Sequence, residues 1–470
     1  MTDIAEAIAP LVATTASTHH CPEVSWGVVV DGALAAHGGT PDRVFRIASM
    51  TKSFTCAAVL ALRDEGALSL DVPIAEYAPE LAGVRGPAGS APITLRHLMS
   101  MTSGLATDDP WADRHLDMAP AELDALCAAG PWFAARPGDR FEYSNLGFGL
   151  VGRVVERVTG RRVRAHVTER LLEPLGMTRT TWDCPDHDDW ARPHLVRDGA
   201  AVADPLPPLG DGEIAPMGGL WSTVADLAVW TMWFDDAVTR PDATDWVGLS
   251  PASRREMQRQ HTYMGVLPTA GRRSHTGYGF GVNVRDDPRL GTLVAHSGGL
   301  PGYGSNMRWC AGRRLAAIAL ANVTYAPMAD LTTQMLVVLH DAGLAPAPRR
   351  APSPEVEQLA RHLATVLDSW DDAAPDAPHL RLDDLFADNV VPDLDLRRRA
   401  RAARELVTAH GRLHVESITC SGMADATVHL RTADGSSVTV TMRLAPLPVP
   451  RLQDYTVTVG GTETDTDTDD

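Results

Sequence analysis

The chain has 470 residues, of which 44% are hydrophobic and 22% are charged, and its formal net charge is −18. This composition is typical of a globular protein with two or three domains. The negative charge argues against nucleic acid or an anionic membrane as a partner. No apolar run is long enough to cross a bilayer, and residues 1–18 lack the basic start and apolar core of a signal peptide, so we expect a cytoplasmic protein.

The first predicted elements are a β-hairpin and a helix. Residues 25–38 predict a hairpin that turns at Asp31-Gly32, because Asp-Gly is a preferred two-residue turn. Residues 49–65 predict a helix, which Gly66 ends. The stretch that follows, to about residue 275, is predicted to be mostly helical and is interrupted by loops rich in Pro and Gly.

From residue 278 onward the pattern changes to that of strands. Four short β-like segments follow one another, and a helix over residues 328–343 closes the unit; the segments are 278–284, 291–299, 304–310 and 313–323. The order hairpin, helices, strands, helix predicts one antiparallel sheet built from both ends of the domain. The expected fold class is therefore α/β (α+β), a sheet flanked by helices with a helical region inserted between its two parts.

This first domain is predicted to span residues 1–345. Residues 346–354 are a linker rich in Pro, Ala and Arg. Residues 355–460 predict a small α+β domain, because two helical segments precede four segments with alternating polarity. The acidic tail, residues 461–470, is expected to be disordered and to keep the protein soluble.

One residue stands out in the composition. The chain holds 42 lysines and arginines together, and Lys52 is the only lysine. On a solvated surface lysine and arginine are nearly interchangeable, but only lysine can lose its proton in a protein. The single lysine is either an accidental survivor of a coding bias or the mark of a site that needs a nitrogen base.

Ser49 lies three residues before Lys52, at the predicted start of a helix. This spacing places both side chains on one helical face, one turn apart. A neutral lysine amine there can take the proton of the serine hydroxyl, which is otherwise a weak nucleophile. The pKa of the lysine must then fall from about 10.4 toward about 7 to 8, and we expect burial and positive neighbours to lower it.

Two further motifs accompany this pair: Tyr143-Ser144-Asn145, and His296-Ser297-Gly298-Gly299 at the end of a predicted strand. Together the three motifs resemble the S-x-x-K, Y-x-N and K/H-x-G elements of the serine β-lactamase and penicillin-binding-protein superfamily. Flanking phrases such as "HSGGLPGYGS" resemble its esterase and peptidase branch. The resemblance covers roughly residues 20–345 and implies a β-lactamase/transpeptidase-like fold.

The resemblance also implies a role for each catalytic position. Ser49 is the expected acylated nucleophile and Lys52 its base. Tyr143 is expected to shuttle protons to the leaving group and to activate the second acceptor. His296 stands where many relatives have lysine and is expected to steer the proton network or a substrate carboxylate. Without the family pattern, Tyr143 could be a core aromatic residue and His296 an ordinary edge-strand histidine.

Asn145, Gly298 and Gly299, together with the backbone of Ser49, are expected to bind the substrate. Asn145 would hydrogen-bond its amide or carbonyl, although the same residue could serve as the N-cap of the helix that follows. The backbone N–H groups of Ser49 and Gly299 would form the oxyanion hole. Gly298 and Gly299 would let the substrate run alongside the strand edge. The mechanism needs no metal and no other cofactor.

These motifs predict a serine hydrolase that acts through an acyl-serine on small esters or on D-residue-containing amides and peptides. The alternative is a penicillin-binding-protein-type thioesterase or cyclase of nonribosomal peptide assembly, acting on a peptide bound to a carrier protein or as a thioester. A further alternative, from another class, is a non-catalytic ligand-binding or sensor protein on the same scaffold. A cytoplasmic protein would not meet cell-wall substrates.

Overall fold

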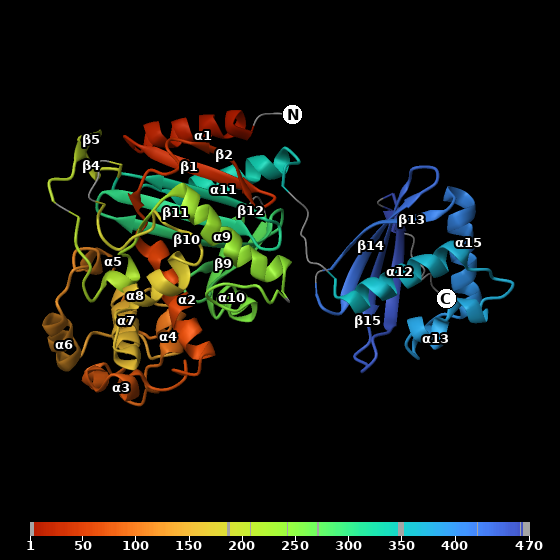
Figure 1. Ribbon diagram of the computed structural model, residues 1–470, viewed down its shortest axis with the longest axis horizontal. Helices are drawn as coiled ribbons and strands as arrows, with labels where there is room; N and C mark the ends of the chain where they lie inside the picture. Colours follow the sequence, from red (N-terminus) through yellow and green to blue (C-terminus); the bar gives the residue numbers. More distant parts are fainter. Residues whose placement is uncertain are drawn as a thin grey trace. The chain divides into compact units, whose positions relative to one another are not determined.

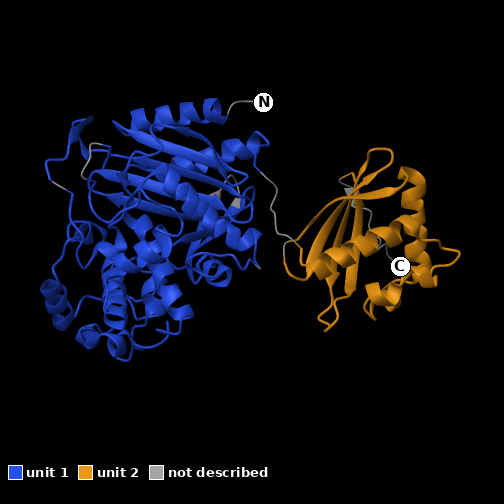
Figure 2. Ribbon diagram, viewed as in Figure 1, with its two compact units in different colours: residues 1–347 blue, residues 348–470 orange. Residues whose placement is uncertain are grey.

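The computed structural model describes residues 4–185, 189–206, 208–241, 243–269, 272–345, 352–420, 422–460 and 462–463. The chain divides into two compact units, Met1–Ala347 and Pro348–Asp470 (Figure 2). Most of the predicted linker (346–351) and most of the predicted acidic tail (461 and 464–470) lie outside the described residues.

An eight-stranded antiparallel sheet forms the centre of unit 1 (Figure 1). Its order is β2-β1-β12-β11-β10-β9-β8-β7, so the first hairpin pairs with the last strand and both ends of the unit share one sheet. The predicted fold class is confirmed. The strands are β1 (Val24–Val30), β2 (Ala33–Gly38), β7 (Thr262–Thr269), β8 (Arg272–Tyr278), β9 (Asn283–Asp287), β10 (Gly291–Leu300), β11 (Tyr303–Cys310) and β12 (Leu315–Ala321).

The strands of unit 1 begin earlier than the sequence predicts. The sheet continues through the β7–β8 hairpin, which the sequence analysis assigned to the helical stretch. Tyr263, Val266 and Leu267 of this edge hairpin are exposed, so apolar and polar residues do not alternate there as they do on a half-buried strand. Two short strand pairs were also not predicted: β3 (Phe45–Arg46) with β6 (Trp221–Ser222), and β4 (His194–Arg197) with β5 (Ala200–Ala203).

Helices cover both faces of the sheet (Figure 1). On one face α1 (Ile4–Thr18) packs on α11 (Met328–Asp341), which contacts β11 and β12. On the other face α9 (Val224–Thr239) and the inserted helical region share one core with the sheet. No helix in the described part of the chain is long and apolar enough to cross a membrane. The remaining helices of unit 1 are α2 (Thr51–Asp64), α3 (Ile74–Tyr77), α4 (Leu95–Met99), α5 (Asp109–Ala112), α6 (Pro120–Ala129), α7 (Asn145–Thr159), α8 (Val163–Val167) and α10 (Pro251–Met257).

Unit 2 is a sheet with two main helices and its own core. The strand order is β13-β14-β15-β16-β17, and α12 contacts β13, β14 and α15. Alternating burial along β14 and β15 explains why their period-2 pattern was visible in the sequence. The elements are α12 (Pro354–Ser369), α13 (Leu382–Leu385), α14 (Val390–Asp393), α15 (Leu396–His410), β13 (Leu413–Thr419), β14 (Asp425–Thr432), β15 (Ser437–Leu444), β16 (Leu452–Val459) and β17 (Thr462–Glu463).

Candidate active site

Ser49 lies in a 3₁₀ turn, Ala48–Met50, immediately before α2. The turn is strained, because Ala48 has a φ of +50°, a conformation that residues other than glycine rarely adopt. Strand β10 packs tightly against it: a Cβ on Gly298 would lie 2.1 Å from the carbonyl oxygen of Ile47. Gly298 is therefore required for this packing, a role that the sequence analysis did not assign to it. Ser49 is 9% exposed.

Lys52 lies in the first turn of α2, a helix buried from Thr51 to Leu62. Because the helix is surrounded by core, the Lys52 side chain has no access to water. Its Nζ donates to Ser49 Oγ at 2.8 Å, to Asn145 Oδ1 at 2.7 Å and to the Met217 carbonyl oxygen at 2.9 Å. The structure thus brings the serine and the lysine together as the spacing predicts, and adds a backbone acceptor that the sequence did not indicate.

Burial lowers the pKa of Lys52 from 10.5 to about 7. The nearby carboxylates of Asp109, Asp113 and Asp108 act in the opposite direction and raise this pKa. The expectation of positive neighbours is wrong: the surrounding charges are negative, and desolvation alone lowers the pKa. At neutral pH a large fraction of the amine is therefore free of its proton.

Asn145 connects Lys52 to the acidic segment 108–113, which contains the short helix α5. Its Nδ2 donates to Asp109 at 2.6 Å and to Asp108 at 3.2 Å, while its Oδ1 accepts from Lys52. The N-cap of α7 is Ser144, whose hydroxyl accepts from the N–H of Gly147, so the interpretation of Asn145 as the N-cap is wrong. Sequence reasoning missed the two aspartates, for which the only signal was the acidic segment 108–113.

Tyr143 lies directly before this helix, partly buried, with its ring against Lys52. Nζ of Lys52 is 4.9 Å from the centre of the Tyr143 ring, and the Tyr143 hydroxyl hydrogen-bonds Ser49. Burial raises the pKa of Tyr143 well above its usual range, and the bond with Ser49 offsets only part of this. The hydroxyl is therefore protonated and lies beside the serine oxygen.

His296 lies on β10 and faces Tyr278, a residue that sequence reasoning did not select. Nε2 of His296 is 2.9 Å from the Tyr278 hydroxyl, and Nδ1 is 2.6 Å from the carbonyl oxygen of Ser297. Burial, and to a smaller extent the charge of Lys52, lower the pKa of His296 to about 3. The imidazole is neutral, so it cannot attract a substrate carboxylate by charge.

The segment of β10 from His296 to Leu300 has an unpaired edge. Strand β9 pairs with β10 only from Gly291 to Ala295, whereas β11 pairs with the other edge of β10 from Leu293 to Leu300. Gly299 lies in this segment, and a Cβ there would lie 2.6 Å from the ring of Tyr325. The free edge therefore runs past the turn that carries Ser49, where an extended ligand can add as a further strand.

Comparison with known proteins identifies the family to which this arrangement belongs. The family model described as Beta-lactamase matches residues 4–341. The chain belongs to the beta-lactamase family. The resemblance inferred from the three motifs is thereby confirmed.

Several relatives of this beta-lactamase-family chain are known. Esterase EstB of Burkholderia gladioli is 30% identical over 348 residues, which cover 64% of this chain and 82% of EstB. Protein flp of Staphylococcus aureus (strain MRSA252) is 25% identical over 304 residues, 63% of this chain and 57% of flp, so the chain spans little more than half the length of that protein. The octameric penicillin-binding protein homologue from Pyrococcus abyssi has the same fold, with a TM-score of 0.62 and 21% identity over 97% of this chain and 95% of its own.

Proposed function

We propose that this protein is a serine hydrolase that acts through an acyl-serine on small esters or D-residue-containing amides and peptides. The observation that supports this most directly is the 2.8 Å hydrogen bond between Ser49 Oγ and a buried Lys52 amine whose pKa is about 7. The 30% identity to an esterase of the same family favours an ester as substrate.

In the first step Lys52 Nζ takes the proton of Ser49, and Oγ forms a bond to the acyl carbon. Asn145 and the Met217 carbonyl hold the amine in place through their bonds to Nζ. The backbone N–H groups of Ser49 and Gly299 stabilise the charge that develops on the acyl oxygen. The backbone of Gly298 and Gly299 runs alongside the substrate at the free β10 edge. Asn145 is fully buried and its amide is bonded to Lys52, Asp108 and Asp109, so it acts by holding the amine.

Acylation ends when the bond between the acyl carbon and the leaving group breaks: Tyr143 gives its proton to the leaving group, and the acyl chain remains on Ser49 as an ester. In deacylation the tyrosine recovers a proton from the attacking water as the water oxygen bonds to the acyl carbon. The bond from the acyl carbon to Oγ then breaks, and Lys52 returns its proton to Ser49. His296 is neutral and is held in place by its hydrogen bond with Tyr278. It forms part of the wall of the site and stays uncharged in both steps.

The alternative is a thioesterase or cyclase, in which a peptide bound to a carrier protein or as a thioester is released by its own amine instead of water. This alternative is retained because unit 2 is separate and has its own core, which matches the small second domain expected of such thioesterases. A purely ligand-binding protein is disfavoured, because Ser49, Lys52 and Tyr143 are all present and in contact.

The first experiment measures turnover of p-nitrophenyl butyrate by the wild type, with Ser49→Ala as the blank. Turnover above the blank is the expected result, and an acyl-enzyme mass adduct should form in the wild type alone. A peptidyl thioester is then supplied, and mass spectrometry separates hydrolysed from cyclised product. Rapid acylation without turnover would instead support the binding protein.

The proposed base also predicts the pH dependence. The active form of Lys52 is neutral, so kcat/KM should rise with pH through about 7 and then level off. Because Lys52 is the only lysine, labelling with ¹³Cε-lysine gives a single NMR signal, which should titrate at about 7 and not near 10.5.

Replacing Asp109 by asparagine should move the midpoint of the kcat/KM profile and that of the NMR titration to lower pH. The reason is that the Asp109 carboxylate raises the pKa of Lys52. Asp139→Asn is the matched control: Asp139 is exposed and is not among the groups that shift Lys52. An Asp109→Asn variant that keeps the wild-type midpoint would contradict the electrostatic coupling.

A further inference from the structure

Arg46 is a buried arginine with two unused donors. It lies on β3, three residues before Ser49, and is 3% exposed. Nη1 donates to the carbonyl oxygen of Leu209 at 2.6 Å, and the guanidinium lies 5.2 Å from the centre of the Trp221 ring. Nε and Nη2 have no hydrogen-bond partner among the described residues. Burial lowers the pKa of Arg46 to about 10, so it remains charged at neutral pH.

Arg153 is a buried arginine with a purely structural role and serves as a comparison for Arg46. It is equally buried at 3% exposed, yet its guanidinium is surrounded by the carboxylates of Glu213, Glu80 and Asp124, at 2.9, 3.2 and 2.5 Å. No carboxylate forms an ion pair with Arg46 in the described part of the chain. The charges of Asp211 and Asp117 act on Arg46 without forming an ion pair with it, and Nε and Nη2 still lack an acceptor, which is costly for a buried cation.

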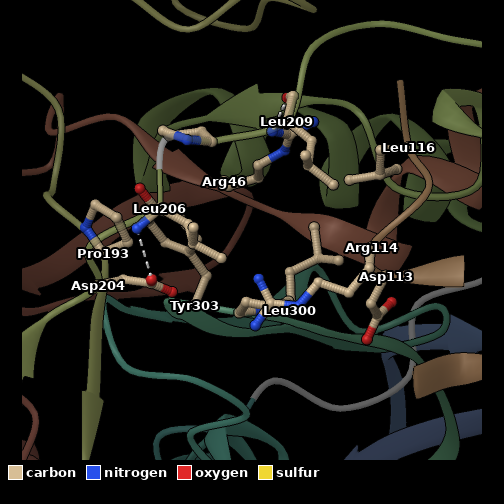
Figure 3. Close-up of a pocket in the computed structure, with 12 residues that line it drawn as sticks. Arg46, Asp113, Arg114, Leu116, Pro193, Asp204, Leu206, Leu209, Leu300 and Tyr303 are labelled. Atoms are coloured by element: carbon tan, nitrogen blue, oxygen red, sulfur yellow. Dashed lines mark hydrogen bonds between the residues drawn. The ribbon is translucent and has the colours of Figure 1, made fainter. Parts of the chain in front are cut away.

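The unused donors belong to a side chain that lines a narrow cleft of about 30 Å³, room for one small polar group such as a carboxylate (Figure 3). A second cation, Arg114, lines another wall, and no carboxylate pairs with it among the described residues. Much of the remaining surface is apolar, provided by side chains that include Leu116, Leu206 and Leu300. Two guanidinium groups with apolar walls fit a carboxylate carried on an aliphatic chain.

Two aspartates also line the cleft, and both already accept hydrogen bonds from the protein. Asp113 accepts from the Tyr325 hydroxyl at 2.5 Å, and Asp204 accepts from the N–H of Leu206 at 3.0 Å. Neither forms an ion pair with Arg46 or Arg114 in the described residues. The arginines therefore keep donors available to a ligand.

The cleft continues the free edge of β10. Leu300 and Pro301 line it and directly follow Gly299. Leu116, on another wall, is close to the turn of Ser49, since a Cβ on Gly218 would touch both Leu116 Cδ2 and Ala48 Cα at 3.7 Å. After the leaving group departs, an acyl chain extending along β10 from Ser49 would run toward this cleft, whose lining begins at the residue after Gly299.

We propose that the cleft binds the distal carboxylate of an acyl chain held on Ser49, with Arg46 as the buried partner and Arg114 at the rim. The preferred acyl donors are then half esters or amides of dicarboxylic acids. This rests on the proposed acyl-serine function, but binding to the cleft requires no chemistry and can be measured separately.

The test uses the full-length Ser49→Ala protein and calorimetry with two probes, monomethyl pimelate and dimethyl pimelate, which differ by one charge. We expect the half ester to bind about tenfold or more tightly than the diester, because its carboxylate receives charge-assisted hydrogen bonds. Adding Arg46→Gln should remove this preference, and adding Arg114→Gln should reduce it. Arg361→Gln, an exposed arginine of unit 2, is the control for net charge and should leave it unchanged.

Equal affinity for the two probes in the Ser49→Ala protein overturns the proposal, even if every arginine variant misfolds. A preference that survives Arg46→Gln also overturns it. Wild-type kinetics then distinguish failure of the proposed hydrolase function from failure of the proposed carboxylate site. Turnover of p-nitrophenyl butyrate without faster turnover of p-nitrophenyl hydrogen pimelate supports the hydrolase and contradicts the carboxylate site. If neither ester is turned over but calorimetry shows a preference for the half ester, the hydrolase function is contradicted and the carboxylate site is supported.

Discussion

Lys52→Arg should reduce kcat/KM for p-nitrophenyl butyrate by about 10²–10⁴-fold, the contribution typical of a positioned general base. An arginine keeps the positive charge but cannot give up its proton in a protein. It therefore cannot take the proton of Ser49, whatever hydrogen bonds it makes to Asn145 and to the Met217 carbonyl. The rate should fall close to that of Ser49→Ala.

Two controls accompany this variant. Arg63→Lys on the same helix adds a lysine away from the site and should leave the rate unchanged. Lys52→Met has a side chain of similar length without the amine, and circular dichroism and thermal unfolding show whether each variant at position 52 is folded. If folded Lys52→Arg turns over as fast as the wild type, lysine is not the base and the mechanism is wrong.

Features that are local in the chain were predictable from the sequence. The hairpin turn at Asp31-Gly32 and the helix that ends at Gly66 depend on a few neighbouring residues, and the structure contains both. The pair Ser49 and Lys52 is also local, because helical geometry fixes their spacing. The error at the N-cap of α7 was a shift of one residue, from Ser144 to Asn145.

The environment of Lys52 could not be predicted in this way. Its acceptors Asn145 and Met217 lie 93 and 165 residues away in the chain, and only the packing of α2 brings them together. The side chain of Met217 is buried, and its backbone carbonyl oxygen accepts the hydrogen bond from Lys52. The sign of the nearby charges was likewise set by the segment 108–113, which contains the short helix α5 and whose position no spacing in the sequence reveals.

Tyr143→Phe should produce a loss that depends on the leaving group. The hydroxyl hydrogen-bonds Ser49 and its high pKa keeps it protonated, so it is suited to give a proton to a departing oxygen or nitrogen. A p-nitrophenolate departs without help, whereas an alkoxide or an amine must be protonated. We expect kcat/KM to fall about tenfold for p-nitrophenyl butyrate and about 10²–10³-fold for an alkyl ester or an anilide of the same acid.

The dependence of the loss on the leaving group distinguishes a general acid from a residue that only positions Ser49. Phenylalanine keeps the ring that packs 4.9 Å from Lys52 Nζ, so the variant removes the hydroxyl and little else. Tyr77→Phe, which removes a hydroxyl bonded to Ser69 far from the site chemistry, should affect all substrates equally and slightly. Equal losses on activated and unactivated substrates in Tyr143→Phe would show that the hydroxyl only positions Ser49, and that the proton for the leaving group comes from Lys52.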